Sequence, residues 1–187
     1  MGIVMQVIHQ ETIRDLTLKI MLDPEPPNPR EWDNLGTMVC RHKRYRLGDT
    51  DQLLAGKQRE TAIMLPLYLY DHSGITMRTR PFDCPWDSGQ VGCIYVLPDE
   101  VKREYGCKRV TPTIRAKVLE VLEQEVKTYD QYLRGECYGY VIERDGQHLD
   151  SCWGIYQNES PTADDSYVLE CARDAANAIE PVEACYV

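Results

Sequence analysis

Two short segments of the chain combine residue types that could bind or catalyse. Residues 30–36 read REWDNLG and residues 84–92 read CPWDSGQVG, so each segment places a Trp-Asp pair before a glycine. This combination favours a rigid loop. It joins a large aromatic ring to an acid that can hydrogen-bond to nearby backbone and to a glycine that can adopt a positive φ. A rigid loop can hold an active site, can contact a partner through Trp32 and Trp86, or can be a packed corner of the fold.

An enzyme built on these loops would use polar side chains in or near them. Cys84 could act as a nucleophile with a histidine as its base, but Asp83 and Asp87 flank the thiol and disfavour its thiolate. Glu125 falls within an apolar helical stripe, where a buried carboxylate needs a structural partner or serves as a general acid or base. Such a hydrolase or transferase requires both loops to converge on one pocket. Its candidate residues are Asp33, Asn34, His42, Cys84, Asp87 and Glu125.

Sequence motifs for common catalytic sites are absent. The chain contains no phosphate-binding glycine loop, no Gly-x-Ser-x-Gly elbow and no His-Glu-x-x-His motif. Its eight cysteines are scattered, and no two are separated by only two residues as in zinc knuckles. We therefore expect no metal and no cofactor, and a protein without enzymatic activity is favoured.

The net charge of −9 is unevenly distributed along the chain. Residues 1–80 have a net charge of +1, whereas residues 119–187 contain 15 acidic and 4 basic residues. An acidic surface repels nucleic acid and attracts cationic protein grooves, although acidity can also serve only solubility. Direct nucleic-acid binding is therefore not expected. The acidic side chains expected to be exposed are Glu120, Glu123, Asp130, Glu136, Asp164 and Asp165.

Residues 41–46, with the sequence RHKRYR, form the only dense basic island of the chain. Its cations could bind phosphate, nucleic acid or an acidic protein face. They could equally pair with the acidic residues of the same fold or of a second copy, so a homodimer is an open alternative. The cations of this island are Arg41, Lys43, Arg44 and Arg46.

The order of expected strands and helices predicts an α+β fold with a mainly antiparallel sheet. Strands are predicted at 16–22, 63–70, 75–79, 91–97, 138–143 and 147–153. Helices are predicted at 98–105 and 112–134, and a last helix should begin after Ser160 or Thr162 and run to about Ala178. We expect one domain over residues 1–157 and a helical extension over 158–187 that packs on it. No apolar run approaches the roughly 20 residues of a membrane helix, and the start lacks a signal peptide, so a cytoplasmic protein is expected.

Five phrases of this sequence resemble those of a family of small proteins encoded by phages and other mobile elements. The resemblance covers residues 16–156, and it does not extend over the tail from Asn158. The phrases are PREWDNLGTM at 29–38, YRLGD at 45–49, CPWDSGQVG at 84–92, YDQYL at 129–133 and DSCWG at 150–154.

The resemblance implies a function in countering host defence. Related mobile-element proteins include inhibitors of RNA-guided CRISPR nucleases, whose nucleic acids lie in positively charged channels. The resemblance thus implies a non-enzymatic inhibitor that binds a host nuclease complex in the bacterial cytoplasm and blocks its DNA binding or cleavage. The acidic face would then act as a mimic of DNA.

Overall fold

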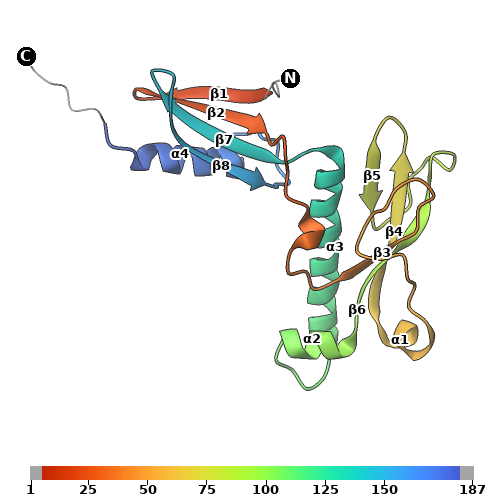
Figure 1. Cartoon of the computed structure of the whole chain (residues 1–187). Coiled ribbons are helices and arrows are strands. Elements are labelled where there is room, and N and C mark those ends of the chain that lie inside the picture. The colour runs from red at the N-terminus through yellow and green to blue at the C-terminus, as the bar shows by residue number, and fades with distance from the viewer. Residues whose placement is uncertain (1–5, 182–187) are drawn as a thin grey trace, which may run out of the picture. The chain divides into compact units, whose positions relative to one another are not determined.

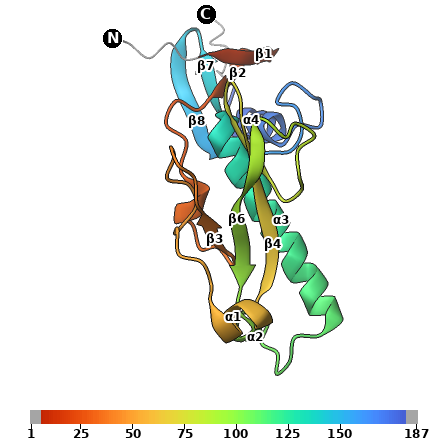
Figure 2. The same cartoon turned by 90° about the vertical axis from the view of Figure 1, so that its right-hand side faces the viewer.

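The structure, a computed structural model, describes residues 6–181 and divides the chain into two compact units (Figures 1 and 2). Unit 1 combines the chain up to Pro27 with the chain from Gly135 onward, and unit 2 comprises residues 28–134. Unit 2 is therefore inserted between two halves of unit 1. This division differs from the expected boundary at residue 157, because the segment after that residue packs with the amino-terminal strands. Residues 182–187 of the expected extension lie outside the described residues.

Unit 1 is a four-stranded antiparallel sheet with one helix packed on it, in the strand order β1-β2-β7-β8. The central pair joins distant parts of the chain, since Leu22 of β2 lies opposite Tyr138 of β7. Alternate residues of β2, including Leu16, Leu18 and Ile20, are buried beneath the helix. The elements are β1 (Val7–Ile13), β2 (Leu16–Leu22), β7 (Tyr138–Arg144), β8 (Gln147–Ile155) and α4 (Tyr167–Ala178).

A buried amide fixes the start of α4 within unit 1. The Oε1 atom of Gln157 accepts a hydrogen bond of 2.8 Å from the backbone N–H of Val168, and its Nε2 atom donates to the Ser166 hydroxyl at 3.1 Å. These bonds satisfy a donor that the first turn of a helix leaves unpaired. The helix begins at Tyr167, later than predicted, because residues 160–166 form turns.

Unit 2 is a second antiparallel sheet, in the order β3-β6-β4-β5, with a long helix packed against β4, β5 and β6 (Figure 2). Both the α+β class and the long helix agree with the prediction. Its elements are η1 (Pro29–Glu31), β3 (Thr37–Cys40), α1 (Gly56–Thr61), β4 (Ile63–Asp71), β5 (Ile75–Arg78), β6 (Ser88–Val96), α2 (Pro98–Glu104) and α3 (Pro112–Arg134).

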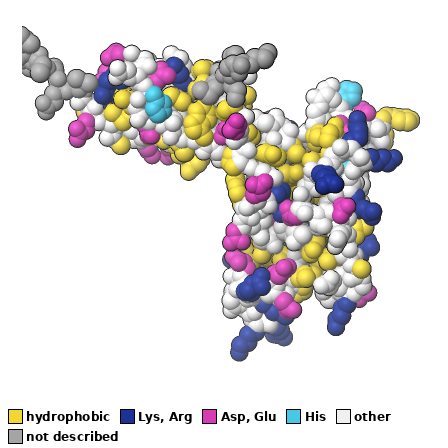
Figure 3. Space-filling view, viewed as in Figure 1, with side chains coloured by type: hydrophobic (Ala, Val, Ile, Leu, Met, Phe, Trp, Pro, Cys, Tyr) yellow, Lys and Arg dark blue, Asp and Glu magenta, His cyan; other side chains and the backbone are white. Residues whose placement is uncertain are grey.

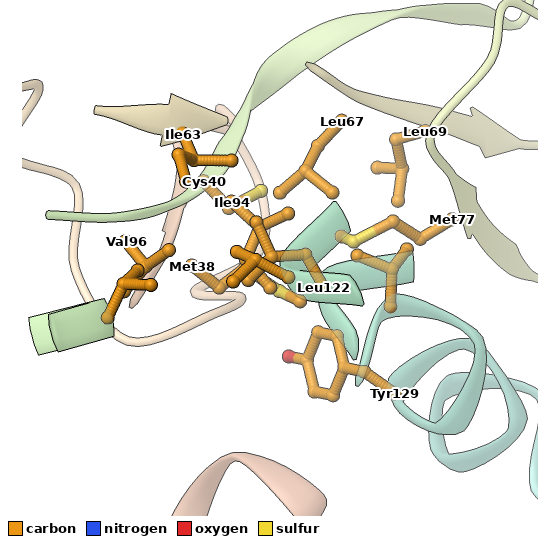
Figure 4. Close-up of a cluster of buried hydrophobic side chains, with 13 residues drawn as sticks. Met38, Cys40, Ile63, Leu67, Leu69, Met77, Ile94, Val96, Leu122 and Tyr129 are labelled. Carbon is orange, nitrogen blue, oxygen red and sulfur yellow. The ribbon is translucent and has the colours of Figure 1, made fainter. Parts of the chain in front are cut away.

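The sequence signals at the two ends of α3 act as predicted. The Thr111 hydroxyl accepts a hydrogen bond of 3.3 Å from the N–H of Ile114, and Gly135 ends the helix with a φ of +71°. Between these ends, the apolar stripe of α3 packs on the sheet. Figure 4 shows Leu122 and Tyr129 of this helix among the buried side chains of β3, β4, β5 and β6.

Candidate functional site

The first Trp-Asp motif is held by a buried ion-pair network. Arg30 lies in η1 with its side chain only 4% exposed, and its Nη1 atom donates to the Oε2 atom of Glu125 at 3.0 Å. Its Nε and Nη2 atoms donate to the two carboxylate oxygens of Asp49 at 2.9 and 2.7 Å. Burial opposes the charge of Arg30, but the two carboxylates raise its pKa above the usual value. Arg30 therefore stays charged and joins three segments of unit 2.

Glu125 has a structural role in this network. Its Oε1 atom accepts hydrogen bonds from the backbone N–H groups of Leu35 and Gly36 at 2.8 and 3.1 Å. With Arg30 as its third donor, the carboxylate accepts hydrogen bonds at both oxygens and holds the motif against α3. Of the two roles considered for Glu125 from the sequence, the geometry favours the structural one.

Two further phrases of the resemblance pack in the same unit. The Tyr129 hydroxyl accepts a hydrogen bond of 3.1 Å from the N–H of Gly48, and Asp49 accepts one of 2.7 Å from the N–H of Met38. The residues after Trp32 also stabilise the loop itself, since the Asn34 amide donates to the carbonyl of Pro29 at 2.8 Å. Hydrogen bonds therefore link three of the five phrases within unit 2, namely those at 29–38, 45–49 and 129–133.

A cleft of about 570 Å³ opens beside the first Trp-Asp motif, between η1, α2 and α3. Trp32, 48% exposed, lines this cleft together with Tyr105, Val121 and Glu120. Asn34 and Glu125 also line it, but both already have the partners described above, whereas Asp33 is exposed on the loop. The cleft has aromatic walls and no assembled set of catalytic groups among the described residues.

The two Trp-Asp loops lie at opposite ends of the sheet of unit 2. The first loop leads into Thr37, which pairs with Tyr95 near the end of β6, whereas the second loop leads into Ser88 at its start. The seven residue-to-residue steps from Ser88 to Tyr95 span roughly 23 Å at about 3.3 Å per step. The convergence on one pocket that the enzyme hypothesis required is therefore not found.

The second loop does not arrange Cys84 as a nucleophile. The sulfur atom of Cys84 lies 3.8 Å from the Oδ2 atom of Asp87, and that same oxygen lies 3.3 Å from the Nδ1 atom of His72. In a cysteine–histidine site the imidazole stands between the thiol and the acid, so that it can take the thiol proton. Here the acid stands between them, so the imidazole of His72 is not placed to take the thiol proton.

Asp71, which sequence reasoning missed, joins the second loop to the basic island. Its carboxylate forms an ion pair with Arg44 and lies 4.0 Å from the Nε2 atom of His42, while its backbone N–H donates to the Asp87 carbonyl at 2.9 Å. The island and the second Trp-Asp loop therefore meet at one end of unit 2. The available sequence signal is the Asp-His pair at residues 71 and 72, between the strands predicted at 63–70 and 75–79.

The described residues do not gather metal ligands. No three His, Cys, Asp or Glu side chains in residues 6–181 lie together in a way that could hold a metal ion. Burial raises the pKa of the Cys40 thiol to about 11, so this neighbour of His42 stays protonated near neutral pH. None of the helices within these residues is both long and apolar enough to cross a membrane.

The acidic candidates fall into both units and differ in exposure. Asp130 is a correction, because its Oδ1 atom accepts a hydrogen bond of 2.7 Å from the N–H of Met77 and its Oδ2 atom pairs with Arg134 at 3.1 Å. Its side chain is only 14% exposed, so it is a structural residue of α3. Glu120 is exposed and Glu123 half-buried in unit 2. In unit 1, Glu136 is half-buried, and Asp164 and Asp165 are exposed.

The charge of the chain divides between the units more sharply than along the sequence. Unit 1 contains 4 basic and 15 acidic residues, a net charge of −11, whereas unit 2 contains 17 basic and 15 acidic residues, a net charge of +2. The whole negative balance therefore belongs to unit 1.

Comparisons of this chain with protein-family models, curated proteins and solved structures give no significant match. The candidate functions therefore depend on the surfaces described above.

Proposed function

We propose that this protein is a non-enzymatic anti-defence protein that binds a host RNA-guided nuclease complex through the acidic surface of unit 1. Carboxylates of unit 1 would occupy a cationic channel in place of nucleic-acid phosphates and so block DNA binding. The bacterial cytoplasm is the compartment in which such a partner is met. The observation that carries the proposal is the charge of −11 in unit 1.

The four cations of unit 1 are engaged within the unit and leave many carboxylates uncompensated. Lys19 pairs with Glu143 at 2.6 Å, and Arg173 donates to both oxygens of Glu11 at 2.8 and 2.9 Å. The other two cations are held at main-chain or carboxylate oxygens: Arg14 at the carbonyls that end α4, and Arg144 at Asp15 and at the Glu180 carbonyl.

Four of the exposed acids of unit 1 lie at α4 and in the turn before it. Glu170 and Asp174 are exposed and lie one helical turn apart, on the side of α4 opposite to its buried residues Val168 and Ala172. Asp164 and Asp165 are exposed in the turn that leads into the helix. Four carboxylates thus lie on or directly before one short helix, where a cationic groove could contact them together.

The test compares two sets of charge-neutralising substitutions in the full chain. The first set removes the acids at α4, and the second removes the same number of exposed acids from unit 2. Each protein is added to a guide-loaded CRISPR nuclease, and target-DNA binding is measured by gel shift. The α4 set is Asp164→Asn, Asp165→Asn, Glu170→Gln and Asp174→Asn, and the control set is Glu31→Gln, Asp51→Asn, Glu60→Gln and Glu104→Gln.

We expect the α4 set to weaken inhibition at least tenfold and the control set to change it less than twofold. Thermal unfolding of both variants shows whether the folds are intact. Equal inhibition by the α4 set and the parent chain would contradict the use of unit 1, and a parent chain that leaves DNA binding unchanged would contradict the inhibitor function.

A further inference from the structure

We infer that the end of unit 2 that carries the second Trp-Asp loop binds single-stranded nucleic acid. We call this end the aromatic tip; it comprises the basic island at 41–46, the β4–β5 turn at 70–75 and the loop at 78–88. The aromatic tip belongs to unit 2, whereas the acidic surface belongs to unit 1. The features that matter at the tip are aromatic rings and cations, and no carboxylate of unit 1 is involved.

Trp86 is the most exposed large hydrophobic residue among the described residues, with 92% of its surface open to solvent. The loop that presents it is held at several points: the Ser88 hydroxyl donates to the Cys84 carbonyl, and Asp87 binds both the backbone N–H of Asp71 and the imidazole of His72. An indole ring held open on an ordered loop offers a flat apolar face at little entropic cost.

Three further aromatic rings lie at the same end of unit 2, and one of them, Phe82, belongs to the loop that carries Trp86. The centroid of His72 lies 6.1 Å from that of Tyr70, and the centroid of Tyr70 lies 5.6 Å from that of Phe82. The guanidinium carbon of Arg78 then lies 3.9 Å from the Phe82 centroid. Three aromatic rings therefore lie in a row with a cation at its end, and stacking rings beside cations are typical of sites that bind successive bases.

The basic island supplies cations to the same end of the unit. Its Arg44 is fixed to the Asp71 carboxylate, and the ring of His42 stacks on Tyr45 with centroids 5.1 Å apart and an interplanar angle of 9°. The residues of the island and of the chain up to Asp51 line a hollow of about 1010 Å³. Its remaining cations, Arg41, Lys43 and Arg46, are exposed. Phosphates of a strand that stacks on Trp86 would meet these cations.

From the sequence, nucleic-acid binding was not expected because the chain as a whole is acidic. That acidity belongs to unit 1, while unit 2 alone has a net charge of +2. Figure 3 shows hydrophobic side chains protruding at this end of unit 2 with Lys and Arg side chains beside them. A single strand fits these features better than a duplex, whose base faces are stacked inside, or a membrane, which needs a broader apolar surface.

The test measures binding of the full chain to a fluorescent single-stranded oligonucleotide by anisotropy, at 50 and 200 mM salt. We compare Trp86→Ala with Trp32→Ala, the half-exposed tryptophan at the other end of the sheet. We also compare two double variants. The first combines Arg41→Ala and Lys43→Ala in the aromatic tip. The control combines Lys108→Ala and Arg109→Ala, at two cations that are exposed outside the tip.

We expect Trp86→Ala to weaken binding roughly tenfold, because it removes the aromatic ring on which a base would stack. The Arg41/Lys43 pair should weaken binding and reduce the salt dependence, whereas both control variants should remain within about twofold of the parent. Absence of binding, an equal effect of the control variants, or tighter binding to duplex DNA or to anionic vesicles would overturn the inference. Binding between two copies that the same substitutions abolish, without oligonucleotide binding, would overturn it as well.

Discussion

The guanidinium of Arg30 and the carboxylate of Glu125 form a buried ion pair with an N–O distance of 3.0 Å, although 95 residues separate them in the chain. This contact fixes the first Trp-Asp motif to the middle of α3. It gives Arg30 of the first Trp-Asp motif a structural role, so a bound ligand is not needed to explain this arginine. The first motif is thus a packed corner of unit 2, whereas the second presents Trp86 to solvent.

Removal of the Glu125 carboxylate should strongly destabilise unit 2. Glu125→Ala leaves Arg30 with one acid and leaves two backbone N–H groups without their acceptor, so we expect a loss of about 3 kcal/mol in the free energy of unfolding. Glu125→Gln keeps an acceptor and should lose less. Urea unfolding measures both, with Glu120→Gln as the control on the same helix. A loss below about 1 kcal/mol for Glu125→Ala would contradict the role of the network.

Gly92 is required where β6 passes β3. A Cβ atom at Gly92 would lie 1.8 Å from the carbonyl oxygen of Val39, whereas a Cβ atom at Gly89 of the same strand would meet no atom within 4 Å. Gly92→Ala should therefore cost about 3 kcal/mol or more, and Gly89→Ala should change stability by less than about 1 kcal/mol. Thermal and urea unfolding measure the difference. Similar stabilities of the two variants would show that β3 does not pair with β6 as described.

The cysteines should differ widely in their reactivity toward a thiol reagent. Burial raises the pKa of the Cys40 and Cys137 thiols to about 11, so almost no thiolate is present at pH 8, and labelling should require unfolding or strongly alkaline conditions. Cys152 is exposed and should react first among the cysteines of residues 6–181. Labelling followed by peptide mass spectrometry measures the order among these positions, and Cys152→Ser should leave the slow labelling of Cys40 and Cys137 unchanged. Early labelling of Cys40 would contradict its burial.

Unit 1 should fold without unit 2. The insertion leaves and re-enters unit 1 at neighbouring strands, since the Asp23 N–H donates to the Cys137 carbonyl at 2.9 Å. A linker of about six Gly and Ser residues can therefore join Pro27 to Gly135 in place of residues 28–134. We expect cooperative thermal unfolding and slow amide exchange in β2 and β7. A chain without either property would show that the two units are not separate folding units.

Local signals predicted most of the elements but not their assembly into two units. The cap at Thr111, the stop at Gly135 and the apolar spacing between them were sufficient for α3, because these signals lie within the helix itself. The pairing of Leu22 with Tyr138 was not predictable, because no pattern in either strand specifies a partner more than 100 residues away. The strand at Val7–Ile13 was missed for a related reason, since its edge position leaves most of its residues partly exposed.

The candidate surfaces were also only partly predictable from the sequence. The acidity of the carboxyl-terminal third was visible in the sequence, but its separation from the basic island became clear only when residues 28–134 formed a unit of their own. Asp130 was expected to be exposed because charged residues of a surface helix usually are, but it binds the Met77 N–H. The meeting of Asp71, Arg44 and Asp87 depends on contacts between three loops, which periodicity does not describe.

The central claim is that the acidic surface of unit 1 competes with DNA for a host nuclease complex. Its most direct test immobilises a guide-loaded CRISPR nuclease and measures binding of this protein with and without saturating target DNA. We predict binding that bound DNA prevents and that the α4 charge variant loses, while the unit 2 control set binds like the parent chain. Binding that persists in the presence of DNA, or that the α4 variant retains in full, would contradict the claim.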